Sequence, residues 1–163
     1  MRNINNGFTL VELMITIAVA AILLAIGVPS LTSVYEQVRV DNNIEKVHNL
    51  FAFARNQAIS YGATVNVCSF ATATSCGTST DWSNGIRVYI TDADNKDHEL
   101  RAIDGFGGLD KIKFSAISMT FTAEGLSSGG TLIYCPNAKA SGSQSVSVST
   151  SGLVSYGSND NAC

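Results

Sequence analysis

The sequence predicts an α+β fold in which one long N-terminal helix packs on an antiparallel β-sheet globular domain. Three observations predict it: an apolar run near the N-terminus, a helical repeat of apolar residues after it, and a period of two from residue 63 onward. The length of 163 residues suits one domain and an anchor. We expect a polar leader (1–7), a membrane-spanning helix (8–28), an amphipathic helical stem (29–62) and a β-rich domain (63–163).

The apolar run from Phe8 to Val28 contains 21 residues, and about 20 are needed to span a bilayer as a helix. Arg2 precedes the run, which favours a cytoplasmic N-terminus with the rest of the chain outside. An ordinary secretory signal would have a cleavage site after the apolar core, and this sequence does not follow that order. Glu12 lies within the run, where a carboxylate costs roughly 2.5–3.5 kcal/mol, so we expect it to have a function.

After Pro29 the apolar residues recur at helical spacing, which predicts that the helix continues as an amphipathic stem. The stripe comprises Leu31, Val34, Val38, Ile44, Val47, Phe51, Ala54, Ala58 and Tyr61. Asn42 and Asn43 mark a point where the helix can bend. Gly62 is suited to end it.

From residue 63 the pattern predicts short strands joined by turns rich in Gly and Asn. The expected strands are Thr64–Cys68, Gly85–Thr91, Glu99–Ile103, Lys111–Ala116, Met119–Thr122, Thr131–Cys135, Ser145–Thr150 and Leu153–Tyr156. No second long helical pattern and no internal repeat is visible, so the domain is expected to be mainly β.

The chain has four cysteines, and an even number in an exported domain favours two disulfides. Three pairings are possible. The short separation of Cys68 and Cys76 favours a bond that closes a hairpin or loop, in which case Cys135 would join Cys163. No C-x-x-C motif is present, so a zinc site is not expected.

Composition and motifs argue against an enzyme and against nucleic-acid binding. Ten basic and thirteen acidic residues give a net charge of −3, which offers no bulk attraction to DNA or RNA. The sequence shows no nucleophile motif, zinc-protease motif or phosphate-binding loop, so no cofactor is expected. Four acids between Asp92 and Glu99 leave calcium as an alternative, but Lys96 and the irregular spacing favour a solvated turn.

The N-terminal motif Gly7-Phe8-Thr9-Leu10-Val11-Glu12 resembles the class III signal of type IV pilins and of the pseudopilins of type II secretion. Pro29 also fits this pattern. The resemblance implies cleavage after Gly7 by a prepilin peptidase and methylation of the new amine of Phe8. In a low-dielectric helix bundle, the carboxylate of Glu12 would then be tolerated beside the amine of a neighbouring subunit.

Several later stretches resemble the GspH/FimT/FimU group of minor pilins. They are Phe53–Ile59 with Val65–Cys68, Trp82–Tyr89 with Glu99–Arg101, Phe121–Gly125 and Ser149–Gly152. The resemblance implies a minor pilin of a type IV pilus. Its expected partners are other major and minor pilins, the peptidase and methyltransferase, and the pilus assembly machinery.

The same resemblance implies a single-pass inner-membrane protein whose globular domain lies in the periplasm, or at the cell surface once the pilus is assembled. An H-type pseudopilin of type II secretion is the main alternative. A DNA-uptake pilin of the FimT type is a further one. Such relatives carry arginines in a C-terminal Gly-Arg-x-Arg motif, whereas Gly152-Leu153-Val154-Ser155 has none here, and no DNA-binding residue is expected.

Overall fold

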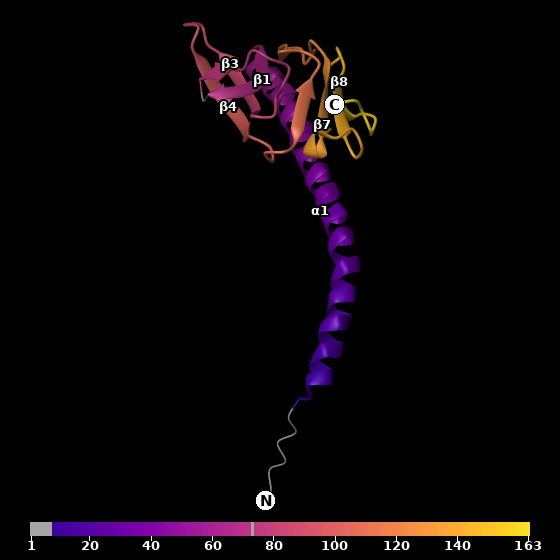
Figure 1. Ribbon diagram of the computed structural model, residues 1–163. Helices are drawn as coiled ribbons and strands as arrows, with labels where there is room; N and C mark the ends of the chain where they lie inside the picture. Colours follow the sequence, from indigo (N-terminus) through magenta and orange to yellow (C-terminus); the bar gives the residue numbers. More distant parts are fainter. Residues whose placement is uncertain (1–7, 73) are drawn as a thin grey trace, which may run out of the picture. The chain divides into compact units, whose positions relative to one another are not determined.

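The computed structural model describes residues 8–72 and 74–163, apart from the side chains of Pro29 and Ser30. These residues form one long helix, nine strands and a short 3-10 helix (Figure 1). The α+β fold class, with a long N-terminal helix packed on antiparallel strands, is confirmed. The chain divides into two compact units after Gln37, a boundary inside the expected stem.

Helix α1 runs without interruption over Leu10–Tyr61. It ends where Gly62 adopts a φ of +61°, a left-handed conformation that glycine reaches without a Cβ clash. The helix continues through Asn42 and Asn43, and the side-chain amide of Asn43 donates a hydrogen bond to the hydroxyl of Tyr134 at 2.8 Å. This position therefore serves as a contact to the globular domain.

The strands form two antiparallel sheets. The first has the order β2-β1-β3-β4, with β6 paired to the first half of β1. Its strands are β1 (Val65–Thr72), β2 (Ser75–Cys76), β3 (Gly85–Thr91), β4 (Asp97–Asp104) and β6 (Ser118–Phe121). The second has the order β5-β7-β8-β9, comprising β5 (Lys111–Phe114), β7 (Gly130–Cys135), β8 (Gln144–Val148) and β9 (Val154–Tyr156). The 3-10 helix η1 (Pro136–Ala138) follows β7.

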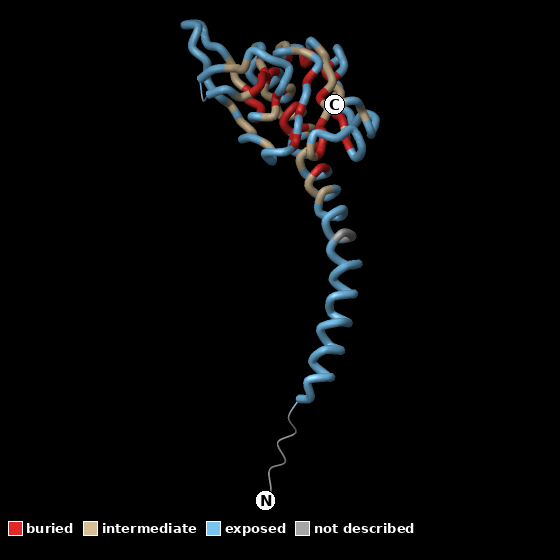
Figure 2. The backbone as a smooth tube through the Cα atoms, in the orientation of Figure 1, coloured by how far each residue is buried: buried red, intermediate tan, exposed pale blue. Residues whose placement is uncertain are grey.

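One hydrophobic core joins the second part of α1 to both sheets, and Figure 2 shows the buried residues concentrated there. The helix contributes Val40, Ile44, Val47, Leu50, Phe51, Ala54 and Ala58. Phe51 contacts Phe114 of the second sheet edge-on, with ring centroids 6.2 Å apart, and Phe114 stacks on Trp82 at 4.4 Å. The same cluster includes Val67 and Val88 of the first sheet and Leu132 of the second, so both sheets share one core with α1.

The eight expected strands all occur, with ends shifted by a few residues. The structure adds β2 and η1, which the alternating pattern did not predict because both are very short. The apolar stripe predicted for the stem extends beyond the buried part of α1 at both ends. Leu31, Val34, Val38 and Tyr61 are all exposed, and Val40 and Leu50 are buried instead.

Candidate assembly segment of the N-terminal helix

The first turn of α1 is closed by a reciprocal pair of hydrogen bonds between Thr9 and Glu12. The Thr9 backbone N–H and hydroxyl donate to the Oε2 atom of Glu12 at 3.2 and 3.1 Å. In return, the backbone N–H of Glu12 donates to the Thr9 hydroxyl oxygen at 3.2 Å. This is a capping box, in which the residue before the helix and the third helical residue satisfy each other's free N–H groups.

The capping box explains how a carboxylate can begin an apolar helix. The negative charge lies at the positive end of the helix dipole, where it is stabilised. Only Oε2 takes part in the two hydrogen bonds that Glu12 accepts from Thr9. The charge and the remaining acceptor capacity of the carboxylate are therefore available to a cation from outside the chain.

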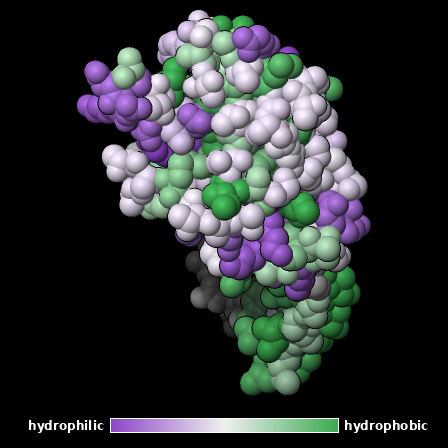
Figure 3. Space-filling model, turned by 90° about the horizontal axis from the view of Figure 1, so that it is seen from above, coloured by the Kyte–Doolittle hydropathy of each residue, from purple (hydrophilic) through white to green (hydrophobic). Residues whose placement is uncertain are grey.

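The rest of the first unit presents apolar side chains to its surroundings. The large apolar side chains between Phe8 and Val28 are more than half exposed, for example Leu24 at 63% and Ile26 at 70%. In Figure 3 the helical segment has a largely green, hydrophobic surface, whereas the surface of the globular unit mixes white, purple and green patches. Within the described chain, α1 is the one helix long and apolar enough to cross a membrane. Such a surface requires lipid or other apolar helices around it.

The structure describes Phe8 and Glu12, whereas the expected cleavage residue Gly7 lies outside the described residues. Phe8 is 79% exposed, one residue before the capping box. The donors and the acceptor of the box all belong to Thr9 and Glu12, within the described residues. The sequence did contain the signal for this box, a Thr followed three residues later by Glu at a helix start.

The four cysteines form two disulfides, Cys68–Cys76 and Cys135–Cys163. These are the pairs favoured by the sequence spacing. The first joins β1 to β2, and the second joins the end of β7 to the last residue of the chain. The carbonyl of Cys163 also accepts a hydrogen bond from the Lys113 ammonium, so the C-terminus is held against the second sheet.

The acidic stretch at 92–99 forms the turn between β3 and β4. Asp92 uses its carboxylate internally: Oδ1 accepts from the N–H groups of Asp94 and Lys96, each at 2.9 Å, and Oδ2 contacts the imidazole of His98 at 2.7 Å. The hydrogen bond from His98 is the main reason that the pKa of Asp92 lies below its ordinary value. Among the described residues no group of three or more potential ligands is placed to hold a metal ion.

The basic residues of the strands are divided between the two sheets. Arg87 and Arg101 lie in the first sheet, and Lys111 and Lys113 lie in β5 of the second. Arg87 is buried and pairs with Asp97 at 3.6 Å and Glu99 at 3.3 Å. At the turn before β9, Leu153 is exposed.

A buried polar network, which the sequence analysis missed, links α1 to the second sheet. Asp110 accepts hydrogen bonds from Arg39 at 3.0 Å, from Tyr134 at 2.5 Å and from the N–H of Asn137 at 2.9 Å. Tyr134 in turn accepts from Asn43. Burial, followed by the hydrogen bond to Asp110, raises the pKa of Tyr134, so its hydroxyl stays protonated. The partners lie 24 to 91 residues apart, which is why no local pattern indicated them.

The long helix, the two antiparallel sheets and the N-terminal segment together define a pilin-like protein. A family model described as "Type II transport protein GspH" matches residues 43–152, and one described as "Prokaryotic N-terminal methylation motif" matches residues 2–28. The chain therefore belongs to the GspH family, whose members are structural pilin-like subunits and not enzymes.

Solved structures show the same fold. The type IV minor pilin FimU of Pseudomonas aeruginosa aligns with a TM-score of 0.63 at 22% identity, over 78% of this chain and 95% of that one. The minor pseudopilin EpsH of the type 2 secretion system of Vibrio cholerae aligns with a TM-score of 0.58 at 11% identity, over 74% of this chain and 97% of that one. A comparison with curated protein sequences gives no match.

Proposed function

We propose that this chain is a minor pilin of a type IV pilus that enters the fibre through its N-terminal helix. In this proposal a prepilin peptidase cleaves after Gly7, the amine of Phe8 is methylated, and residues 8–28 anchor the subunit in the inner membrane. The globular domain lies in the periplasm until assembly. The observation that carries the proposal is the capped, exposed, apolar start of α1 with its single carboxylate at Glu12.

Glu12 has two roles in this proposal. It caps its own helix through Oε2, and its charge attracts the terminal amine of the neighbouring subunit. Cleavage after Gly7 would leave Thr9 inside the chain, so the cap would persist in the mature protein. An unpaired charge in an apolar bundle is costly, and a paired one is tolerated, so pairing favours insertion of the subunit beside another in register.

Three variants separate these roles. Glu12→Gln keeps an oxygen that can accept from Thr9 but removes the charge, and we expect incorporation into fibres to fall about tenfold or more, the effect of about 1.4 kcal/mol. Thr9→Ala keeps the charge but weakens the cap by about 1 kcal/mol, so incorporation should fall less. Glu12→Ala loses both. Incorporation is measured as the amount in sheared fibres divided by the amount inserted in the membrane.

A Glu12→Gln protein that assembles like the wild type would remove the charge-pairing role. Mass spectrometry of the mature N-terminus tests processing: the expected species begins with N-methylated Phe8. Gly7→Ala should abolish that species, and complete cleavage in this variant would reject Gly7 as the key residue.

The alternative is an H-type pseudopilin of type II secretion, which the description of the matching family model favours. The pilus is preferred because the two disulfides, including the one at Cys163, resemble the pilus branch of the group. A strain lacking this protein separates the two: loss of surface fibres supports the pilus, and loss of secreted enzymes with intact fibres supports secretion. Loss of transformation alone would indicate a DNA-uptake pilin.

A further inference from the structure

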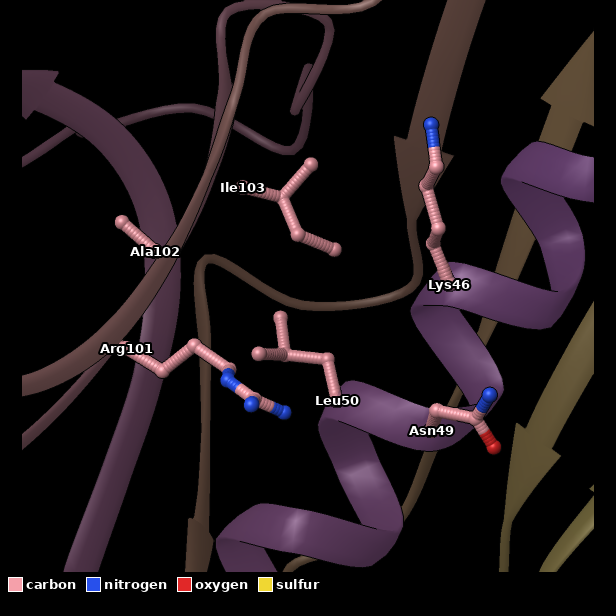
Figure 4. A pocket seen from close by; sticks show the side chains of 6 residues that line it. All are labelled: Lys46, Asn49, Leu50, Arg101, Ala102 and Ile103. Atoms are coloured by element: carbon pink, nitrogen blue, oxygen red, sulfur yellow. The ribbon is translucent and has the colours of Figure 1, made fainter.

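A hollow in the surface of the globular unit lies between the second part of α1 and the edge strand β4. It has a volume of about 260 Å³ and is lined by Lys46, Asn49, Leu50, Arg101, Ala102 and Ile103. Figure 4 shows Arg101 extending from β4 toward α1, with Leu50 and Ile103 between Arg101 and Lys46. The hollow thus has an apolar base and a cation on each side.

Among the residues that the structure describes, no carboxylate pairs with the two cations of this hollow. None of its six lining residues is acidic. Within the described residues, neither Lys46 nor Arg101 forms an ion pair, whereas Arg39, Arg87 and Lys111 each have a carboxylate partner. The exposed side chains of Lys46 and Arg101 therefore keep their hydrogen-bond donors available to an anion from another molecule.

Arg101 is held in place without using those donors. Its guanidinium carbon lies 4.5 Å from the centroid of the Phe53 ring, a cation–π contact that fixes the plane of the group. A planar guanidinium matches the two oxygens of a carboxylate. Leu50, Ala102 and Ile103 are the apolar residues that line the hollow.

The size of the hollow limits what can occupy it. Small-molecule and cofactor sites usually enclose about 300–1,000 Å³, so this one suits a single side chain better than a cofactor. Nucleic acid binding relies on many phosphate contacts along a basic surface, and this hollow has two cations on a chain of net charge −3. An acidic side chain with an apolar stem, Asp or Glu, fits both the charges and the base.

We propose that the Lys46–Arg101 hollow receives an Asp or Glu side chain from a neighbouring pilin-like subunit in the assembled fibre. This inference rests on the proposed function, because it requires a neighbour of the same class. It adds a contact in the globular domain to the contact of the N-terminal helices. The domain contact selects the neighbour by charge, because an acidic side chain is attracted and a basic one is repelled.

Zero-length carbodiimide cross-linking of fibres that contain the full chain tests this inference. The carboxylate adds to the carbodiimide to give an O-acylisourea. A lysine amine in contact with it then attacks the acyl carbon and forms an amide bond, as the C–O bond to the reagent breaks and the reagent leaves as its urea. We expect a link from Lys46 to an Asp or Glu of another subunit, identified by mass spectrometry. The ion pair of Lys111 with Asp81, 3.3 Å apart, provides an internal positive control in the same sample.

Variants give a second readout. Lys46→Arg keeps the charge but cannot be coupled by the carbodiimide, so the cross-link should vanish. The double variant Lys46→Glu with Arg101→Glu should lower incorporation about tenfold. Lys139→Glu, at an exposed residue just after η1, is a single charge-reversal control and should assemble normally.

Fibres that contain the chain and the Lys111–Asp81 link but no Lys46 link to another subunit would overturn this inference alone. The same conclusion follows if the double reversal assembles like the wild type, or if Lys46 links only within its own chain. Salt-sensitive DNA retention that the double reversal abolishes would assign the hollow to nucleic acid and also overturn it. A wild-type chain that never enters fibres would overturn the proposed function as well.

Discussion

The two parts of α1 place similar apolar residues in opposite surroundings. Before Gln37, Leu24 and its apolar neighbours are exposed along the helix, whereas after it Ile44 and Phe51 are buried against the sheets. Figure 2 shows this change from exposed to buried along one continuous helix. Hydrophobicity in the first part thus provides a surface for lipid or other helices, and in the second part it stabilises the fold of its own chain.

Truncating one apolar side chain in each part of α1 should give the largest difference in the free energy of unfolding. Phe51→Ala removes a fully buried ring that contacts Phe114, and we expect the free energy of unfolding to fall by about 3–5 kcal/mol. Leu24→Ala removes an exposed side chain and should leave the unfolding of the globular domain unchanged. The measurement is chemical unfolding of the full chain in detergent, followed by Trp82 fluorescence. Equal losses in both variants would contradict the comparison.

Both disulfides join residues outside α1, so removing each one tests a contribution to the stability of the globular unit that does not come from the helix. In the chain-entropy description, a bond across 28 residues stabilises more than one across 8, about 3.5 against about 2.5 kcal/mol. Replacing Cys135 and Cys163 by Ser should therefore lower the midpoint of unfolding more than replacing Cys68 and Cys76. The opposite ranking would show that the short loop at β2 contributes through native contacts.

The polar network extends the comparison, because Asn43 in the second part of α1 donates a hydrogen bond to Tyr134 of β7. Tyr134→Phe removes the hydroxyl that joins Asn43 to Asp110, and we expect a loss of about 1–2 kcal/mol in the free energy of unfolding. Tyr35→Phe removes an exposed hydroxyl from the first part and is the control. Equal stability of Tyr134→Phe and the wild type would mean that the network contributes nothing net.

The sequence predicted the helix and eight strands because the spacing of their apolar residues is local information. It did not show where along α1 burial begins. Leu31 and Val40 both suit an apolar stripe, and only the sheets opposite Val40 distinguish them. Strand β2 was missed since it is defined by pairing with β1 and not by its own residues.

The candidate sites also differ in how far apart in the sequence their residues lie. The role expected of Glu12 depends on neighbours in the sequence, and its capping partner Thr9 lies three residues away. The network at Asp110 and the Lys46–Arg101 hollow each bring together residues from α1 and the later part of the chain. Residues so far apart come together only through the fold, and local patterns in a single sequence do not predict such pairs.

The smallest expected effect lies in the turn between β3 and β4, which is remote from either part of α1 in sequence. His98 lowers the pKa of Asp92 below its ordinary value of 3.8, so the folded state binds this proton less readily than the unfolded chain. The contribution to stability is therefore present above pH 3.8 and is lost as the pH falls through the folded pKa. The carboxylate is solvent-exposed, so the effect on stability should be minor.

The pKa of Asp92 can be measured directly from the pH dependence of its carboxyl carbon resonance in the isotopically labelled full chain. His98→Asn should move this pKa back toward 3.8, because the largest cause of its depression is removed. His48→Asn is the matched control: His48 lies on α1 and stacks on Tyr156, with ring centroids 4.6 Å apart, so its loss should leave Asp92 unchanged. If His98→Asn also leaves the pKa of Asp92 unchanged, the backbone N–H groups of Asp94 and Lys96 suffice to hold the carboxylate ionised.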